Sequence, residues 1–304
     1  MRLPPFTHRA RAFALASVLA SLFPCFSSYG TILVSADAVG NLGTSVEAVT
    51  ASGGSVSQTH TGSNPNSPGG NVVGRSSASF GVLRVYAESH IDQAPFGGNF
   101  AGGTASFTDE FTFNDPSRTG QPGSFTFILQ VDGTLAASNR TGQTSGTTFN
   151  FGISTARLSL SVRDVTISGN NINYLSVSEI QNDNGVRSFT GAAFLGQPDS
   201  VSVPFTLGTK SSVEITLTAV ASTKPEFGAD CISNGENTLN WGGITSVNDS
   251  SNATVTNYTL DSGSGANYIQ PIPEPSAITL MVLGGFALFA WKSKTSRLKA
   301  ALGV

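Results

Sequence analysis

Charged residues, cysteine and histidine are all scarce in this chain. Among 304 residues there are 16 basic and 19 acidic side chains, 12% in total, together with two Cys and three His. Helical bundles and coiled coils need many Glu, Lys and Arg residues, so this composition excludes them. It does not indicate disorder, because 20 Phe supply apolar surface and the formal net charge is only −3.

Hydroxyl residues and glycine take the place of charge. The chain holds 41 Ser, 31 Thr and 34 Gly. Strands with one polar face and frequent tight turns use these residue types in number, so the composition favours an all-β fold.

The charges are unevenly distributed along the sequence. Residues 31–270 carry nine basic and 18 acidic side chains, whereas both ends are basic. A segment with a net charge of −9 repels phosphate backbones, which excludes nucleic-acid binding for the central body.

The N-terminus, residues 1–30, has the three parts of a secretory signal peptide. The apolar run Ala12–Phe23 is too short to cross a bilayer as a helix. Ser28 and Gly30 are the small residues expected before a cut ahead of Thr31. The basic region that precedes the run consists of Arg2, His8, Arg9 and Arg11.

Removal of the signal peptide leaves one cysteine in the chain. Cys25 departs with the peptide, and Pro24 before it argues against lipidation, because a small residue is needed there. Cys231 then has no partner for an intramolecular disulfide. The sequence leaves open whether this thiol is buried or pairs with another chain.

The C-terminus, residues 271–304, combines a motif, an apolar segment and a basic tail. Pro273-Glu274-Pro275 precedes the segment Ala277–Trp291, and a tail over 292–299 follows it. Fifteen helical residues span about 22 Å, which is short for a hydrocarbon core of about 30 Å. Trp291 suits the membrane interface, and the basic side chains favour a cytoplasmic tail: Lys292, Lys294 and Arg297.

This arrangement resembles the PEP-CTERM sorting signal of Gram-negative bacteria. The resemblance is confined to the tail, and Ile272 stands before the motif where the family usually has Val. It implies recognition and processing by an exosortase, a membrane-embedded cysteine transpeptidase. It also implies an association with exopolysaccharide and the biofilm matrix. An ordinary single-pass anchor is the alternative.

The body between these ends predicts short strands of alternating polarity separated by turns. The apolar sets each share one parity, which predicts one buried face per strand: Phe107/Phe111/Phe113, Phe125/Phe127/Leu129/Val131, Leu158/Leu160/Val162, Val201/Val203/Phe205/Leu207 and Val213/Ile215/Leu217/Ala219. The expected fold is all-β, a single antiparallel β-sandwich or jelly-roll-like domain over 31–270.

Turn residues supply the expected connections within this domain. Asp132-Gly133 predicts a hairpin, and Gly208-Thr209-Lys210 predicts another between the last two apolar sets. Long loops are expected over 53–74 and 92–103, and a flexible spacer over 261–270.

Chemistry-bearing patterns are few. His60 and His90 have no Gly-x-Ser-x-Gly elbow and no zinc-ligand spacing, so no enzyme, metal or cofactor is expected. Asp109 and Glu110 are adjacent and point to opposite faces of a strand. The run around Asp183 is either a polar turn or a calcium loop. Trp241 is either a sugar-stacking platform or a core residue.

The sequence therefore predicts an exported, non-enzymatic surface or matrix protein that an exosortase sorts. It is anchored in the membrane before processing, with its C-terminus in the cytoplasm. Two alternatives stay open: a module that binds carbohydrate or calcium, and a glycan hydrolase whose carboxylates are not identified.

Overall fold

The computed structural model describes the strands of the central body. The described residues are 30–39, 44–50, 55–63, 71–91, 99–139, 142–144, 147–149, 153–166, 171–183, 186–191, 195–223 and 229–272. All of the regular structure in this part of the chain is extended: β1 Thr31–Val39, β2 Thr44–Thr50, β3 Val56–Ser63, β4 Asn71–Ser79, β5 Val82–Ile91, β6 Asn99–Asn114, β7 Pro122–Val131, β8 Thr134–Asn139, β9 Gly142–Thr144, β10 Thr147–Phe149, β11 Ile153–Asp164, β12 Asn171–Asp183, β13 Val186–Gly191, β14 Pro198–Thr206, β15 Lys210–Thr223, β16 Ala229–Asp249 and β17 Thr259–Ser262.

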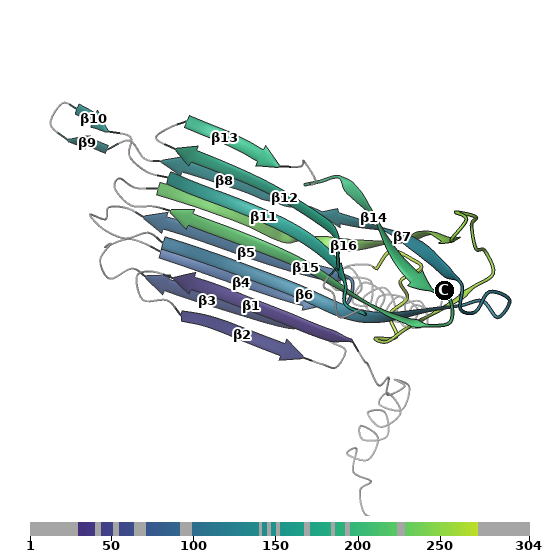
Figure 1. Cartoon of the computed structure of the whole chain (residues 1–304). Coiled ribbons are helices and arrows are strands. Elements are labelled where there is room, and N and C mark those ends of the chain that lie inside the picture. Colours follow the sequence, from purple (N-terminus) through teal and green to yellow (C-terminus); the bar gives the residue numbers. More distant parts are fainter. Residues whose placement is uncertain are drawn as a thin grey trace, which may run out of the picture.

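Two antiparallel sheets form a sandwich-like fold, which confirms the predicted all-β class. The first sheet, here sheet A, has the order β13-β12-β11-β15-β6-β1-β2, with β17 also pairing β6. Sheet B has the order β14-β7-β16-β5-β4-β3, with β8 also pairing β16. The long strands of both sheets run side by side, and the small β9–β10 ribbon lies beyond one end of them (Figure 1).

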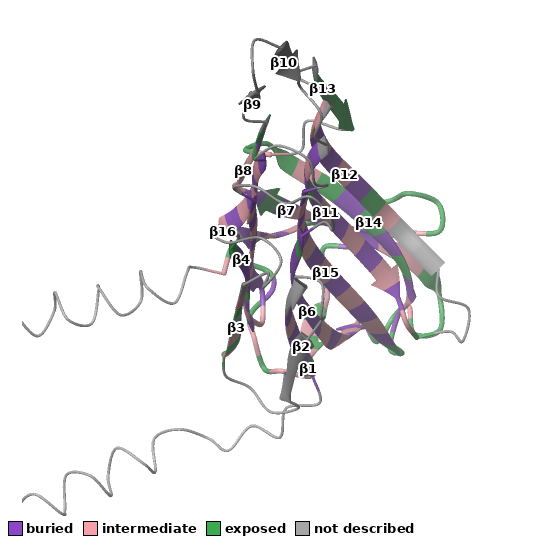
Figure 2. Ribbon diagram, turned by 90° about the vertical axis from the view of Figure 1, so that its left-hand side faces the viewer, coloured by how far each residue is buried: buried purple, intermediate pink, exposed green. Residues whose placement is uncertain are grey.

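The core lies between the sheets and follows the alternation of the sequence. Buried and partly exposed residues alternate along the strands, as the bands in Figure 2 show. Each apolar set predicted to share a face is buried, and one hydrophobic cluster contains members from both sheets. Side chains at every second position therefore form the core, while Ser and Thr occupy many of the outward positions.

The predicted hairpin at Asp132-Gly133 is wrong. Strands β7 and β8 on either side of it both pair antiparallel with β16, through Val131↔Leu239 and Thr134↔Asn234. The chain therefore continues along the same neighbour after these two residues instead of turning back. The register of β16 shifts between Gly235 and Leu239. This irregularity in β16 lies opposite the interruption between β7 and β8.

The predicted hairpin at Gly208-Thr209-Lys210 is also wrong. Strand β14 pairs β7 in sheet B, whereas β15 pairs β11 and β6 in sheet A, so this connection crosses from one sheet to the other. Gly208 has φ +76°, and its N–H donates to the carbonyl of Phe113 at 2.8 Å. Alternation identifies the buried face of a strand but not its neighbour, because strands of either sheet bury one face.

The two predicted loops are shorter than expected. Strands β3 and β4 form an antiparallel pair through most of residues 53–74, and β6 begins at Asn99 within the second predicted loop. Only residues 64–70 and 92–98 between these strands lie outside the described residues.

Candidate functional site

The C-terminal segment that precedes the predicted sorting motif is packed into the sandwich. Its strand β17 pairs with β6, from Thr259↔Asn114 to Ser262↔Phe111. Tyr268 has no exposed surface, and Ile272 packs against the core. The expectation of a flexible spacer over 261–270 is therefore wrong, because apolar residues at its end enter the core.

Trp241 holds this segment through hydrogen bonds from its side chain and to its backbone. Its indole Nε1–H donates to the carbonyl of Tyr268 at 2.8 Å, and the N–H of Ile244 donates to the same oxygen at 3.1 Å. The N–H of Ile272 then donates to the carbonyl of Trp241 at 3.0 Å. The ring of Trp241 is completely buried and stacks on Phe127 with 4.4 Å between centroids. Trp241 is thus a core residue, and its ring offers no platform for a sugar.

Two glycines allow the segment to lie so close to the sheet. Gly243 has φ +96°, and a Cβ there would lie 3.0 Å from the carbonyl oxygen of Ile269. Gly81 has φ +78°, and a Cβ there would lie 2.5 Å from the side chain of Ile272. The Trp-Gly-Gly sequence at 241–243 therefore serves the docking of the chain that follows β17.

A buried carboxylate holds the turn between β17 and Tyr268. Asp109 Oδ1 accepts hydrogen bonds from the backbone N–H groups of Glu110 at 2.8 Å and Ser264 at 2.9 Å. The Ser264 hydroxyl donates to Oδ2 of the same carboxylate. Burial raises the pKa of Asp109 above its ordinary value, while these hydrogen bonds act in the opposite direction. The neighbouring Glu110 faces outward and pairs with Lys210 at 2.8 Å, so the two acids do point to opposite faces.

The predicted sorting residues follow directly after this anchored segment. Pro273, Glu274 and Pro275 lie outside the described residues, as do those expected in the membrane and tail: Trp291, Lys292, Lys294 and Arg297. The predicted signal peptide over 1–30 is likewise outside them except for Gly30. Within the part of the chain that the structure describes, no helix is long and apolar enough to cross a membrane.

Asp183 is the last residue of β12. It pairs with Val186 of β13, so only residues 184 and 185, which lie outside the described residues, connect the two strands. Two residues is the commonest length of the connection in a β-hairpin. Among the described residues, no group of three or more His, Cys, Asp or Glu side chains is placed to hold a metal ion.

The histidine on β5 has a carboxylate partner. His90 Nδ1 pairs with Asp230 Oδ1 on the neighbouring β16. The adjacent Ser89 points the other way, into the core, where its Oγ lies 2.8 Å from the hydroxyl oxygen of Thr223. Because neighbours on a strand face opposite sides of the sheet, Ser89 and His90 do not form a nucleophile–base pair. The side chain of His60 is outside the described residues.

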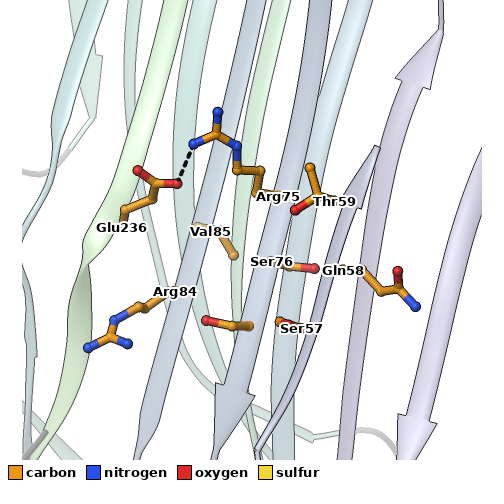
Figure 3. A pocket seen from close by; sticks show the side chains of 9 residues that line it. Ser57, Gln58, Thr59, Arg75, Ser76, Arg84, Val85 and Glu236 are labelled. Atoms are coloured by element: carbon orange, nitrogen blue, oxygen red, sulfur yellow. Dashed lines mark hydrogen bonds and ion pairs between the residues drawn. The ribbon is translucent and has the colours of Figure 1, made fainter. Parts of the chain in front are cut away.

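A small hollow of about 210 Å³ lies over strands β3, β4, β5 and β16 of sheet B. Arg75 reaches Glu236 at 3.1 Å (Figure 3). The same guanidinium lies above the ring of Tyr86, 4.8 Å from its centroid. The Tyr86 hydroxyl donates to Glu88 at 2.7 Å, and the pKa of Tyr86 is raised, first by burial and then by this carboxylate. Arg75 and Glu236 therefore pair with each other, and Glu88 pairs with Tyr86.

A larger hollow of about 400 Å³ lies on the outer face of sheet A. The sequence does not predict this hollow, because its residues alternate with the apolar positions that define the strands. The signal was present as Thr-x-Ser, Ser-x-Ser and Thr-x-Thr at 104–106, 159–161 and 216–218. These pairs form one surface only through the register of the three adjacent strands β11, β15 and β6.

Comparisons with known proteins return no counterpart. No family model matches the chain, no curated protein matches it, and no solved structure matches it.

Proposed function

We propose that this chain is an exported surface or matrix protein that an exosortase-like enzyme sorts through its C-terminal tail. A signal peptide over 1–30, a single sandwich domain and a sorting signal over 271–304 make up the proposed precursor. The proposal gives the body a structural role in an extracellular polysaccharide matrix. Its main support is the order of the tail: Pro273-Glu274-Pro275, the apolar segment 277–291 and then basic residues.

The anchored C-terminal segment is the structural observation that favours this role. The N–H of Ile272 is hydrogen-bonded to the carbonyl of the buried Trp241, so the Pro-Glu-Pro sequence begins at the residue that follows the folded body. A body of this kind would be held against the membrane until the tail is processed. After processing it would keep its C-terminal end tied into the fold.

Cell fractionation tests this proposal. In cells that produce the exosortase, the protein should be recovered from the outer surface or the extracellular matrix. In cells that lack the enzyme, it should stay with the inner membrane. An identical distribution in the two strains would favour an ordinary membrane anchor and contradict the sorting role.

A further inference from the structure

The hydroxyl-lined hollow on sheet A is built from three central strands. Side chains from β6, β11 and β15 project outward at matching register positions, and two rows of hydroxyls result. One row joins Ser161, Thr216 and Ser106, and the second joins Ser159, Thr218 and Thr104. All six line the hollow.

The rows are regular because the sheet is regular. The register is continuous from β11 through β15 to β6 at these positions. Neighbouring strands lie about 4.8 Å apart, and alternate residues on one strand lie about 6.7 Å apart. The result is a grid of hydroxyl groups on a rigid support.

Three of these six hydroxyls are available to a ligand, because Thr104 and Thr218 contact each other and Ser106 is buried, with 4% of its surface exposed. The Thr104 and Thr218 hydroxyl oxygens lie 3.4 Å apart, a long hydrogen bond. Within the described chain, no hydrogen bond engages the hydroxyls of Ser159, Ser161 or Thr216. Each Ser or Thr hydroxyl can donate one hydrogen bond and accept others, so the surface matches a partner that also does both.

Apolar and charged side chains border the grid. Leu33 lies at one end of the first row, and Leu175, of which 59% is exposed, lies at the other. Arg163 and Glu214 face each other across β11 and β15 at the next register position. Arg163 Nε is buried and has no hydrogen-bond partner among the residues that the structure describes. A buried donor beside a hollow can be satisfied by an acceptor that enters the hollow, either water or a ligand oxygen.

We propose that this hollow binds a neutral polysaccharide chain. Sugar hydroxyls donate and accept as Ser and Thr do, and the C–H faces of a sugar ring can lie on Leu33 and Leu175. An acidic polymer fits less well, because residues 31–270 carry a net charge of −9 and Glu214 borders the hollow. This inference deepens the proposed function and depends on it only for the presence of polysaccharide around the protein.

Titration calorimetry on the purified full chain in detergent tests the proposal. The probes are neutral hexose oligomers of glucose, mannose and galactose, with a polyuronate for comparison. The proposal predicts binding of at least one neutral oligomer and a weaker response to the polyuronate. Absence of binding to every neutral oligomer, or binding of the polyuronate alone, would overturn it.

Three variants locate the binding surface. Thr216→Val combined with Thr218→Val keeps the side-chain shape but removes two hydroxyls, and should weaken binding about tenfold. Ser161→Phe should abolish binding by filling the hollow. The matched control is Thr126→Val, a partly exposed threonine of β7 in sheet B, and should leave binding unchanged.

The variants also separate binding from folding. Each should keep the far-ultraviolet circular dichroism and unfolding midpoint of the parent, because the exchanged side chains face outward. Equal affinity in the parent, the double variant and Ser161→Phe would overturn the assignment of the hollow. Removal of the tail in cells is measured independently by mass, so failure of binding leaves the sorting proposal intact, and the reverse also holds.

Discussion

The backbone N–H of Ile272 donates to the carbonyl of Trp241 at 3.0 Å, one residue before Pro273. This bond links the end of the folded body to a core tryptophan of β16. The same tryptophan holds Tyr268 through its indole N–H. The residues between β17 and the predicted sorting motif are therefore a structural part of the sandwich, and the predicted motif begins at the next residue, Pro273.

Gly243→Ala should release this segment from the sheet. The new Cβ would lie 3.0 Å from the carbonyl oxygen of Ile269, at a backbone φ of +96° that disfavours any side chain. We expect a loss of about 2 kcal/mol in the free energy of unfolding, measured by urea denaturation. Hydrogen exchange at the Ile272 N–H should become faster than global unfolding allows.

Gly120→Ala is the matched control for backbone strain. Gly120 also has a positive φ, +83°, but no atom lies within 4 Å of its added Cβ. It should lower stability without faster exchange at Ile272. Equal exchange at Ile272 in both variants would contradict the close approach described at Gly243.

Asp109→Ala should destabilise the sandwich by about 3 kcal/mol in urea unfolding. The substitution leaves the N–H groups of Glu110 and Ser264 and the Ser264 hydroxyl without their buried acceptor. Asp261→Ala removes a carboxylate whose bond to Asn114 is exposed, and should cost less than about 0.5 kcal/mol. Similar losses in the two variants would be inconsistent with a special role for Asp109.

The stability of the protein should depend on pH through the same carboxyl group. Burial raises the pKa of Asp109 in the folded state above its ordinary value of about 4. The folded state then binds the proton more tightly than the unfolded state does. The contribution of Asp109 to stability is therefore fully present below pH 4 and is lost as the pH rises through the raised pKa.

Asp109→Asn isolates this contribution, because an amide retains an acceptor for the two N–H groups and titrates nowhere in this range. The free energy of unfolding of the parent, relative to the variant, should decrease between pH 4 and pH 7. A constant difference over that range would show that Asp109 has the same pKa in both states.

The thiol of Cys231 should be inert in the folded, processed chain. Burial raises its pKa to about 12, and its Sγ donates to the carbonyl of Ser222 at 3.3 Å. Only about one thiol in 10⁴ would be ionised at pH 8. A chromogenic disulfide reagent should therefore react only after unfolding, and mobility in gels should be the same with and without reductant. Rapid labelling of the native protein would contradict the buried position.

The sequence predicted which residues face the core, and failed on which strands are neighbours. Phe125, Phe127 and Leu129 are buried, as their shared parity required. The same alternation occurs in strands of both sheets, so it could not show that the chain crosses between the sheets at Gly208. Nor could it show that the chain continues past Asp132. Those outcomes depend on contacts between residues far apart in the sequence.

The candidate site shows the same limit. Composition predicts a spacer over residues 261–270 because Gly and Ser are frequent there, whereas the buried Tyr268 and the bond from Ser264 to Asp109 hold the segment to the sandwich. The sequence leaves Trp241 as either a core or a surface residue, and its packed neighbours place it in the core. The hydroxyl rows on sheet A could not be seen until the register of three strands was known.

The mass of the protein recovered from the cell surface tests the central claim most directly. In cells that produce an exosortase, we expect a chain that has lost its apolar segment and basic tail. With Glu274→Ala, or without the enzyme, the tail should stay attached to the protein. Glu236 is an exposed glutamate on the body, and Glu236→Ala should leave removal of the tail unchanged. A surface protein that still ends at Val304 in exosortase-producing cells would contradict the account.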